Sequence, residues 1–300
     1  MKYDAVMIGH ISLDHNIDHL DNEAEVIGGA VTFSSASAYA LGHRTLVVTK
    51  LAPEDKKRLD ALVIPKEDIR LLPASSSTVM RNKYFTADKE RRKCRCESVG
   101  TPFSVDDIPD EDAKIFHFAG LIYGDFNNEM IKKAAEKYDV AVDVQTLLRH
   151  RNDDGSMYFE DWKDKKEMLP YIKYLKTDAA EAEIMTGTEN RKEAAKMLFD
   201  MGAKEILITH NTEVLAYDGK EFYTCPIRAR NLSGRTGRGD TTFAAYYCER
   251  LYGDIPQALL FATATVSNKM ETPGAYRGTR EDVINYIREL YPDCLNGITL

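Results

Sequence analysis

The sequence predicts an α/β fold built on a mostly parallel sheet, and two observations support this prediction. From Lys114 onwards, short apolar runs alternate with helical segments, a pattern typical of βαβ units. The chain also begins with an apolar run, Tyr3–Ile8, which is followed by a glycine and suits a buried parallel strand. With 300 residues, of which 43% are hydrophobic, the chain can bury a substantial core.

Charge and composition exclude several classes of protein. The 40 basic and 48 acidic residues give a net charge of −8, which argues against a general nucleic-acid binder. The sequence shows no signal-type segment and no apolar run of about 18 residues, so we expect no membrane association and a cytoplasmic location. The five scattered cysteines are typical of a reducing compartment. Cys94 and Cys96 lack His or Cys partners nearby, which disfavours a zinc site with about four ligands.

The first predicted strand is followed by an acidic residue and a glycine-led helix. Asp14 comes within a few residues of the strand, near the edge where open α/β sheets bind ligands. A solvated loop acid is the alternative. Gly28 and Gly29 precede a run of small residues, 30–41, that predicts a helix ending at Gly42. Two glycines at a helix start can bring the backbone close to a ligand. No Gly-x-Gly-x-x-Gly occurs here, so a dinucleotide fold is disfavoured.

After a strand predicted at 46–51, a pair of β-prone segments carries many basic residues. Residues 78–85 and 91–99 form the pair, joined like a hairpin by residues 87–90. The basic side chains of this hairpin are Arg81, Lys83, Lys89, Arg91, Arg92, Lys93 and Arg95. Most such charge runs form a solvated face, which is the favoured interpretation. Attraction of phosphate, or a homodimer formed through this segment, is the alternative.

The second half of the chain supplies the alternating pattern. The predicted strands are 115–119, 140–144, 172–175 and 206–209, and the predicted helices are 129–137 and 191–202. Asp143 and Gln145 fall at the end of one strand, at the expected ligand edge. Capping of a neighbouring loop is the alternative for both residues. A hairpin at 214–225 follows, and then helices at 255–270 and 280–290.

Two acids at the start of a further helix are candidates for a metal site. Asp178 and Glu181 are three residues apart, so on a helix they share one face. Paired carboxylates suit a hydrated Mg²⁺, which takes few direct protein ligands. Acids that only complement the helix dipole are the alternative.

The stretch 233–251 carries the strongest chemical signal. Gly237 and Gly239 flank Arg238, and Asp240 opens an amphipathic helix. The glycines permit a close approach of a ligand, and the unpaired N–H groups of the helix start form an anion site beside the carboxylate. An anion cradle with a base at its edge is what phosphoryl transfer to a hydroxyl requires. A glycine turn before an ordinary capped helix is the alternative.

Together these motifs resemble those of the ribokinase-like carbohydrate kinases, also called the pfkB family. The family pattern Gly-Ala-Gly-Asp reads Gly237-Arg238-Gly239-Asp240 here, and the arginine is tolerable because the cradle uses backbone N–H groups. The Gly-Gly motif with its small-residue helix matches residues 28–42, although Phe33 replaces a frequent asparagine. Asn-x-x-Glu reads Asp178-x-x-Glu181, and Thr-x-Gly reads Thr209-His210-Asn211, where asparagine also tolerates αL geometry. The Walker pattern of P-loop enzymes is absent.

The resemblance implies one ribokinase-like domain over residues 1–300, with helices on both faces of the sheet and a small β-sheet lid at about 16–27 and 77–99. It implies an enzyme that transfers the γ-phosphoryl group of ATP to a hydroxyl of a sugar or polyol. Asp240 would take the hydroxyl proton, the amides of residues 237–240 would hold the phosphate charge, and Glu181 with Asp178 would bind Mg²⁺ through water. The nucleotide contacts would be Asp178, Thr209, Asn211, Thr263 and Ser267, and the substrate contacts Asp14, Gly28, Gly29, Asp143 and Gln145.

The resemblance leaves one ion open. Many family members also use a monovalent cation. The aspartate that they often place before the cradle is not evident here, since Gly234 and Arg235 stand at that point.

The acceptor is indicated by the segment Val142–Arg149, which looks like the Asp-x-Gln segment of the family's myo-inositol-kinase-like members. Asp14, Asp143 and Gln145 would suit a ring rich in hydroxyls, and a buried binding group left unpaired costs about 1–3 kcal/mol. The prediction is therefore a neutral polyol, either a cyclitol such as myo-inositol or a monosaccharide. The alternatives are a nucleoside kinase and a catalytically silent sugar sensor, and the sensor is disfavoured because Asp240 is retained.

Overall fold

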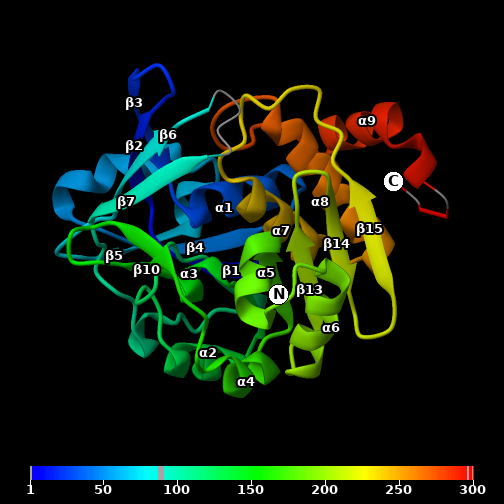
Figure 1. The fold of residues 1–300 in the computed structure, drawn as a ribbon, viewed down its shortest axis with the longest axis horizontal. Coiled ribbons are helices and arrows are strands. Elements are labelled where there is room, and N and C mark those ends of the chain that lie inside the picture. The colour runs from blue at the N-terminus through cyan, green and yellow to red at the C-terminus, as the bar shows by residue number, and fades with distance from the viewer. Residues whose placement is uncertain (1, 87–90, 296, 299) are drawn as a thin grey trace.

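The computed structural model describes residues 2–86, 91–295, 297–298 and 300. A large sheet runs through the molecule with the strand order β15-β14-β13-β12-β9-β8-β1-β4-β5 (Figure 1). Neighbouring strands from β13 to β5 are parallel, whereas β14 and β15 are antiparallel. The strands are β1 Tyr3–Ile8, β4 Thr45–Leu51, β5 Ile69–Pro73, β8 Ala113–Phe118, β9 Asp139–Asp143, β12 Tyr174–Asp178, β13 Glu205–Thr209, β14 Glu213–Tyr217 and β15 Phe222–Pro226. The predicted α/β fold with a mostly parallel sheet is confirmed.

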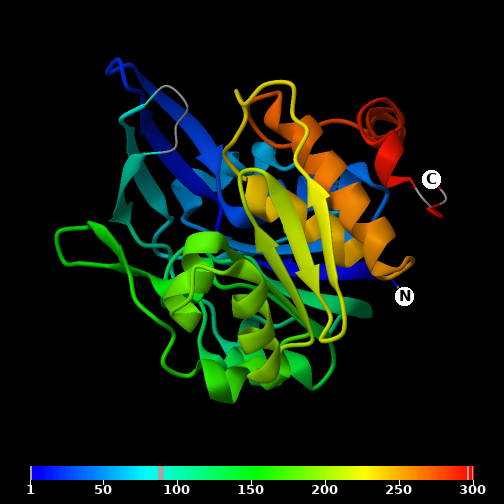
Figure 2. The ribbon, with the colours of Figure 1, turned by 45° about the vertical axis from the view of Figure 1, so that its right-hand side comes forward.

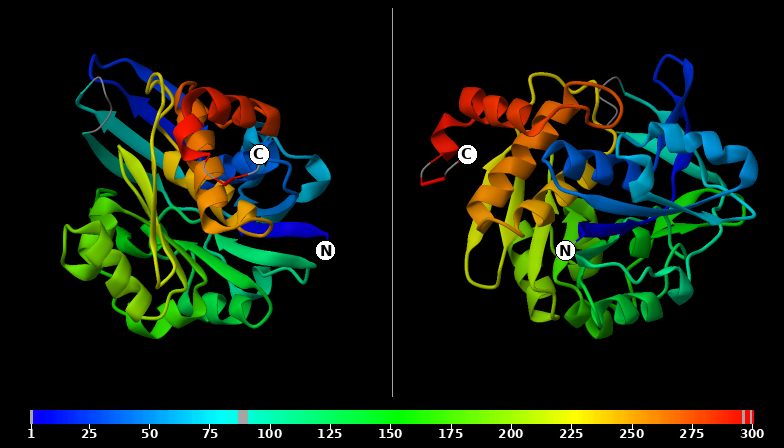
Figure 3. Two further views of the ribbon diagram at one scale, coloured as in Figure 1. Left: turned by 90° about the vertical axis from the view of Figure 1, so that its right-hand side faces the viewer. Right: turned by 180° about the vertical axis from the view of Figure 1, so that it is seen from behind.

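Helices cover both faces of this sheet, as seen from the side and from behind in Figure 3. One face carries α1 Ala30–Ala40, α7 Arg238–Glu249, α8 Ile255–Met270 and α9 Arg280–Leu290, and the other carries α2 Asn128–Ala135, α4 Lys165–Met168, α5 Ala179–Thr186 and α6 Arg191–Asp200. Successive side chains of a strand point to opposite faces, so Met7 packs into the core on one side and Ile8 into the core on the other. None of the helices in the described residues is long and apolar enough to cross a membrane.

A second sheet, which we call the lid sheet, has the strand order β3-β2-β6-β7 and extends away from the main sheet (Figure 2). Its strands are β2 Ser12–Ile17, β3 Glu23–Gly28, β6 Val79–Tyr84 and β7 Arg92–Ser98. Asp14 therefore lies on a lid strand, which begins earlier than the lid segment predicted at about 16–27. The remaining short elements are α3 Gln145–Leu148, the hairpin of β10 Arg149–Arg151 and β11 Met157–Phe159, and 3₁₀ turns at Pro53–Ala61, Lys66–Asp68, Val105–Asp107, Leu169–Tyr171 and Pro292–Cys294.

Two basic residues of the lid hairpin pair with acids rather than face a ligand. Nε of Arg81 donates to Glu97 at 2.6 Å, and Lys83 pairs with Asp21. Arg92 differs, because it lines the cavity described below. Lys89 and the connection 87–90 lie outside the described residues.

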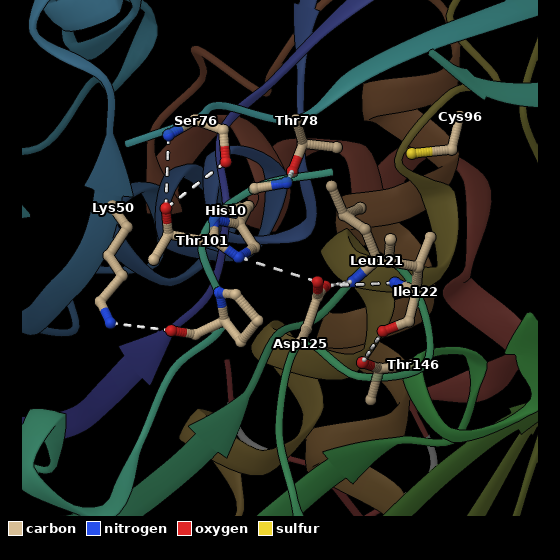
Figure 4. A network of polar contacts seen from close by, with 12 residues as sticks. His10, Lys50, Ser76, Thr78, Cys96, Thr101, Leu121, Ile122, Asp125 and Thr146 are labelled. Carbon is tan, nitrogen blue, oxygen red and sulfur yellow. Dashed lines mark hydrogen bonds and ion pairs between the residues drawn. The ribbon is translucent and has the colours of Figure 1, made fainter. Parts of the chain in front are cut away.

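Polar contacts hold the chain where it crosses between the two sheets (Figure 4). His10, between β1 and β2, is buried with its Nε2 atom 3.7 Å from the Asp125 carboxylate. The other carboxylate oxygen of Asp125 accepts from the N–H of Leu121 at 2.7 Å. The N–H of Gly100 donates to the Thr78 hydroxyl at 3.2 Å, beside the His10 ring. We call this the crossing network; it involves three of the segments through which the chain passes between the lid sheet and the body, at His10, Thr78 and Gly100.

Candidate active site

A cavity of about 480 Å³ lies between the lid sheet and the carboxyl edge of the main sheet. The lid strands contribute Asp14, Met80, Asn82, Tyr84, Arg92 and Cys94 to its lining. The main body contributes Gly29, Phe33, Asp143, Gln145, Arg149, Lys176, Asp178, Thr209 and residues 235–240. The cavity thus brings together eight of the residues that the sequence singled out for catalysis, the cradle and the substrate: Asp14, Gly29, Asp143, Gln145, Gly237, Arg238, Gly239 and Asp240.

The glycine cradle forms the start of α7 as the sequence predicts. Gly237 is the N-cap and has a φ of 78°, which is left-handed geometry that favours glycine. A Cβ atom at Gly237 would lie 2.2 Å from the Phe33 ring, so this ring packs directly beneath the cradle. The N–H of Arg238 donates to the carbonyl of Arg235 at 3.3 Å, a long bond within the same loop. Phe33 therefore supports the cradle, a role that the sequence alone did not reveal.

Asp240 stands in the first turn of α7, where the helix dipole favours a negative charge. Burial raises the pKa of its carboxyl group to about 6, and the nearby Asp143 carboxylate acts in the same direction. Lys176, Lys269 and Arg149 oppose this shift. A carboxylate with a pKa closer to neutrality is a better proton acceptor than an ordinary aspartate, which suits a general base.

The pKa of Asp240 predicts the pH dependence of turnover. A general base must be deprotonated, so kcat/KM is expected to fall about tenfold per pH unit below about pH 6 and to reach a plateau above it, because kcat/KM reports the pKa of the free enzyme. The measurement is kcat/KM for the acceptor against pH at a saturating donor concentration. An acid limb near pH 4, the ordinary range for aspartate, would contradict the assignment of the raised pKa to the base.

A buried lysine in the middle of β12 contacts the carboxylates of the site. Lys176 has its Nζ atom 2.9 Å from Asp143 and 3.7 Å from Glu181, and a Cβ at Gly239 would lie 3.1 Å from the same Nζ. Burial by itself lowers the pKa of Lys176, but the carboxylates of Asp143 and Glu181 raise it above the ordinary value. Lys176 is therefore a fixed positive charge beneath the cradle. The sequence prediction missed it, although a lysine at the end of an apolar run was a visible signal.

The acids Asp178 and Glu181 form a capping box at the start of α5. The N–H of Asp178 donates to Glu181 at 2.8 Å, and the N–H of Glu181 donates to Asp178 at 2.8 Å. Asp178 lines the cavity, whereas Glu181 is buried behind it and burial raises its pKa. The alternative given in the sequence analysis, that these acids stabilise the start of the helix, therefore agrees with the observed contacts.

These acids fit Mg²⁺ only in a supporting role. Within the described residues, no group of three or more His, Cys, Asp and Glu side chains could hold a metal ion. Mg²⁺ keeps several waters and is usually bound by one or two carboxylates together with substrate phosphates. Asp178 at the cavity wall fits that pattern, and Glu181 would act through water.

The wall formed by the lid supplies an acid and the glycines that precede α1. Asp14 is buried and accepts a hydrogen bond from the Ser12 hydroxyl at 2.6 Å, and burial raises its pKa. A Cβ at Gly28 would lie 2.5 Å from the Asp14 carboxylate, and Gly29 has a φ of 100°. Both glycines therefore let the start of α1 pack closely against β2. Asn82, Tyr84, Arg92 and Arg149 also line the cavity, although the sequence prediction assigned none of them to the site.

Asp143 at the end of β9 and the nearby Gln145 make a local contact with each other and also line the cavity. One oxygen of Asp143 contacts Lys176, and the other accepts from the N–H of Gln145 at 3.0 Å. The loop-capping alternative is therefore correct for this contact, while both side chains also line the cavity.

A second hollow lies where the base of a nucleotide was predicted, but its volume is only about 10 Å³. This is about the space that a single water molecule needs, so the hollow is too small for a purine as it stands. It is lined by Thr209, Asn211, Val214, Ile227, Arg238, Val266 and Met270, among others. Asn211 accepts hydrogen bonds from Arg238 at 2.6 Å and from Arg235 at 3.2 Å.

Two predicted nucleotide contacts on α8 point elsewhere. The Thr263 hydroxyl donates to the Leu259 carbonyl within the helix, and the Ser267 hydroxyl bonds the Tyr291 hydroxyl at 2.7 Å. Both residues are fully buried, and neither lines the cavity beneath the lid sheet or the small hollow in the described part of the chain. The face of α8 at the small hollow carries Val266 and Met270 instead.

Known proteins resemble this chain over most of its length. A family model described as pfkB family carbohydrate kinase matches residues 100–282. The cytidine kinase of Thermococcus kodakarensis is 28% identical over 245 residues, which cover 79% of this chain and 84% of that enzyme.

Solved structures extend the similarity. A pyrophosphate-dependent kinase of the ribokinase family, solved with a pyrophosphate analogue and myo-inositol, superimposes with a TM-score of 0.85 at 31% identity, covering 94% of this chain and 99% of that one. The ribokinase of Arabidopsis thaliana, solved with ribose and ATP, has a TM-score of 0.75 at 17% identity, covers 96% of this chain and 99% of that one, and supports the fold alone.

Proposed function

Because this chain belongs to the pfkB family of carbohydrate kinases, and is a kinase, we propose that it phosphorylates a cyclitol of the myo-inositol type with pyrophosphate as the donor. The observation that carries the choice of donor is the hollow of about 10 Å³ at the place expected for a nucleotide base. Pyrophosphate has no base or ribose to place there. The donor predicted from the sequence, ATP, would require this hollow to open.

The positive charge at the cradle supports the same donor. Arg235, Arg238 and Lys176 line the cavity around the start of α7, together with the hydroxyl of Thr209. Guanidinium groups bind phosphate oxygens through paired hydrogen bonds. These contacts can hold a donor that has no base or sugar, in place of the contacts that a nucleotide makes through those groups. The 31% identical relative is described as pyrophosphate-dependent and was solved with a pyrophosphate analogue.

The other half of the cavity supports a polyhydroxylated acceptor. Asp14, Asn82, Arg92, Gln145 and Arg149 supply acceptors and donors from several directions. A ring that carries a hydroxyl on each carbon can satisfy many of these groups at once, whereas buried polar groups left unpaired penalise a poorer ligand.

The reaction follows from this arrangement. The acceptor oxygen attacks the terminal phosphorus of pyrophosphate, the bond from that phosphorus to the bridging oxygen breaks, and inorganic phosphate leaves. Asp240 takes the hydroxyl proton, and the amides of the cradle together with Lys176 stabilise the charge on the transferred group. When bound near Asp178, Mg²⁺ would neutralise part of the donor charge.

A donor and acceptor panel tests the proposal. Pyrophosphate and ATP are each combined with myo-inositol, fructose, ribose, adenosine and cytidine, and the phosphorylated product is quantified by ³¹P NMR. We expect pyrophosphate with myo-inositol to give a kcat/KM at least about 10²-fold above that of the other pairs. A preference for ATP would overturn the donor assignment. A preference for cytidine, which the similarity to a cytidine kinase favours as the second candidate, would overturn the acceptor assignment.

A further inference from the structure

The loop before the cradle is attached to α8 through a buried lysine that the mechanism above does not use. Lys269, in the last turn of α8, is 1% exposed. Its Nζ atom donates to the carbonyl of Gly234 at 2.5 Å and also to the carbonyl of Thr236. The N–H of Gly234 in turn donates to the carbonyl of Met270 at 2.7 Å. The two accepting carbonyls therefore belong to residues that lie three positions and one position before the N-cap of α7.

The ammonium group also sits beside the two features that define the cradle. It lies 5.1 Å from the centroid of the Phe33 ring, the same ring that packs beneath Gly237. It also interacts electrostatically with Asp240. Lys269 does not itself line the cavity, whereas Arg235, Thr236 and Gly237 do, so the lysine lies behind the loop.

Peptide geometry connects this contact to donor binding. The N–H and C=O groups of a trans peptide point in opposite directions, and the described residues contain no cis peptide. When the carbonyls of Gly234 and Thr236 point at Lys269, the N–H groups of Arg235 and Gly237 point to the opposite side of the loop. That side is the cavity.

A cation at this position is difficult to explain as a stabilising feature. Burial lowers the pKa of Lys269 to about 8, although Asp240 opposes the shift, so folding disfavours the charged form. An apolar side chain of similar length would fill the same space without desolvating a charge.

We propose that Lys269 acts as a built-in monovalent cation, which orients the peptide groups of residues 234–237 so that their N–H groups meet the donor phosphate. This proposal rests on the proposed phosphoryl transfer. Lys269 is a positioning residue, because it acts through the loop and does not touch the donor. Carbonyl oxygens are also the ligands that K⁺ uses in proteins, so the lysine makes an external K⁺ ion unnecessary here.

The test compares the variants Lys269→Met and Lys269→Ala with the intact chain. Lys269→Met should reduce kcat/KM for pyrophosphate by about 10²-fold, the effect of losing one preorganised donor to a transition-state oxyanion. It should lower the melting temperature by only a few degrees, because the carbonyls of Gly234 and Thr236 lose their partner but the buried charge is also removed. Lys269→Ala opens a space lined by carbonyls, so about 100 mM ammonium or potassium chloride should restore at least about tenfold of the lost activity, while tetramethylammonium chloride should not.

Lys50 provides a matched control. Its Nζ atom likewise donates to a backbone carbonyl, that of Pro102 at 2.8 Å, and lies 5.2 Å from the centroid of the Phe103 ring. It lines no described cavity. Lys50→Met should therefore leave kcat/KM for pyrophosphate unchanged in every salt.

Three results would overturn the proposal. They are unchanged kinetics in folded Lys269→Met, an equal response of Lys269→Ala to all three salts, and a requirement of the intact chain for K⁺ in tetramethylammonium buffer. The last needs no variant, so it decides the matter even if both variants fail to fold. Stabilisation of the intact chain by pyrophosphate, read as a rise in melting temperature that Lys269→Met lacks, reports donor binding even if no acceptor is phosphorylated.

Discussion

Asp240→Asn is expected to lower kcat by about 10²–10⁴-fold, the usual contribution of general-base catalysis, while the chain stays folded and binds its donor. Asparagine has nearly the same shape but cannot accept the proton of the attacking hydroxyl. The raised pKa of Asp240 and its place at the end of the cavity motivate this expectation. The measurement is kcat at saturating pyrophosphate and acceptor, with donor affinity measured separately by calorimetry.

Asp282→Asn is the matched control. Asp282 occupies the third position of α9, as Asp240 does in α7, but it forms a capping box with Thr279 on the surface. Its replacement should cost at most about 1 kcal/mol of stability and should leave kcat unchanged. Near-normal turnover in Asp240→Asn would show that another group accepts the proton.

Gly237→Val is expected to abolish measurable donor binding, a loss of at least about 10²-fold in kcat/KM for pyrophosphate. Its backbone has a φ of 78°, and the new Cβ would overlap the Phe33 ring at 2.2 Å. Left-handed backbone geometry alone costs a β-branched residue about 1–3 kcal/mol. Because the ring cannot retreat into a filled core, the cradle must move. The measurements are kinetics and thermal unfolding.

Gly42→Val separates backbone strain from steric overlap. Gly42 has a φ of 86°, but an added Cβ would meet no atom within 4 Å. Gly42→Val should lose about as much stability as a β-branched substitution at any left-handed position. Its kcat and KM should stay unchanged. Equal kinetic losses in the two variants would show that the packing of Phe33 beneath the cradle is unimportant.

The local motifs allowed the cradle and most of the sheet to be predicted from the sequence. Two glycines, at 237 and 239, just before an acid are a pattern that is specific to this kind of helix start. Apolar runs of four to six residues mark the buried strands. The contacts of the site's lysines could not be found in this way. The apolar run before Lys176 signals its burial but not its contact with Asp143, and the carbonyl partners of Lys269 also come from a distant segment.

The misplaced contacts on α8 have a simple geometric cause. Thr263 and Ser267 are four residues apart and share one face of the helix, as do Val266 and Met270. Adjacent side chains on a helix point in directions that differ by 100°. An assignment displaced by one residue therefore names a side chain that points into the core instead of one that lines the cavity. The hydroxyl groups of Thr263 and Ser267 suggested that their face of α8 contacts the nucleotide. The small hollow is lined instead by the apolar face of α8, which carries Val266 and Met270.

The dependence of the cradle on α8 also bears on how the protein is made. Synthesis proceeds from the N-terminus at about 5–20 residues per second, so α1 emerges roughly 10–50 s before Lys269 does. For most of that interval, until α7 has been translated, the apolar face of α1 that finally packs against α7 has no partner in the nascent chain. Donor and acceptor cannot protect this intermediate, because the pocket that binds them does not yet exist. The nascent chain should therefore depend on chaperones until its last helices are translated, and truncations at the C-terminal end should be far more damaging than their small share of the sequence suggests.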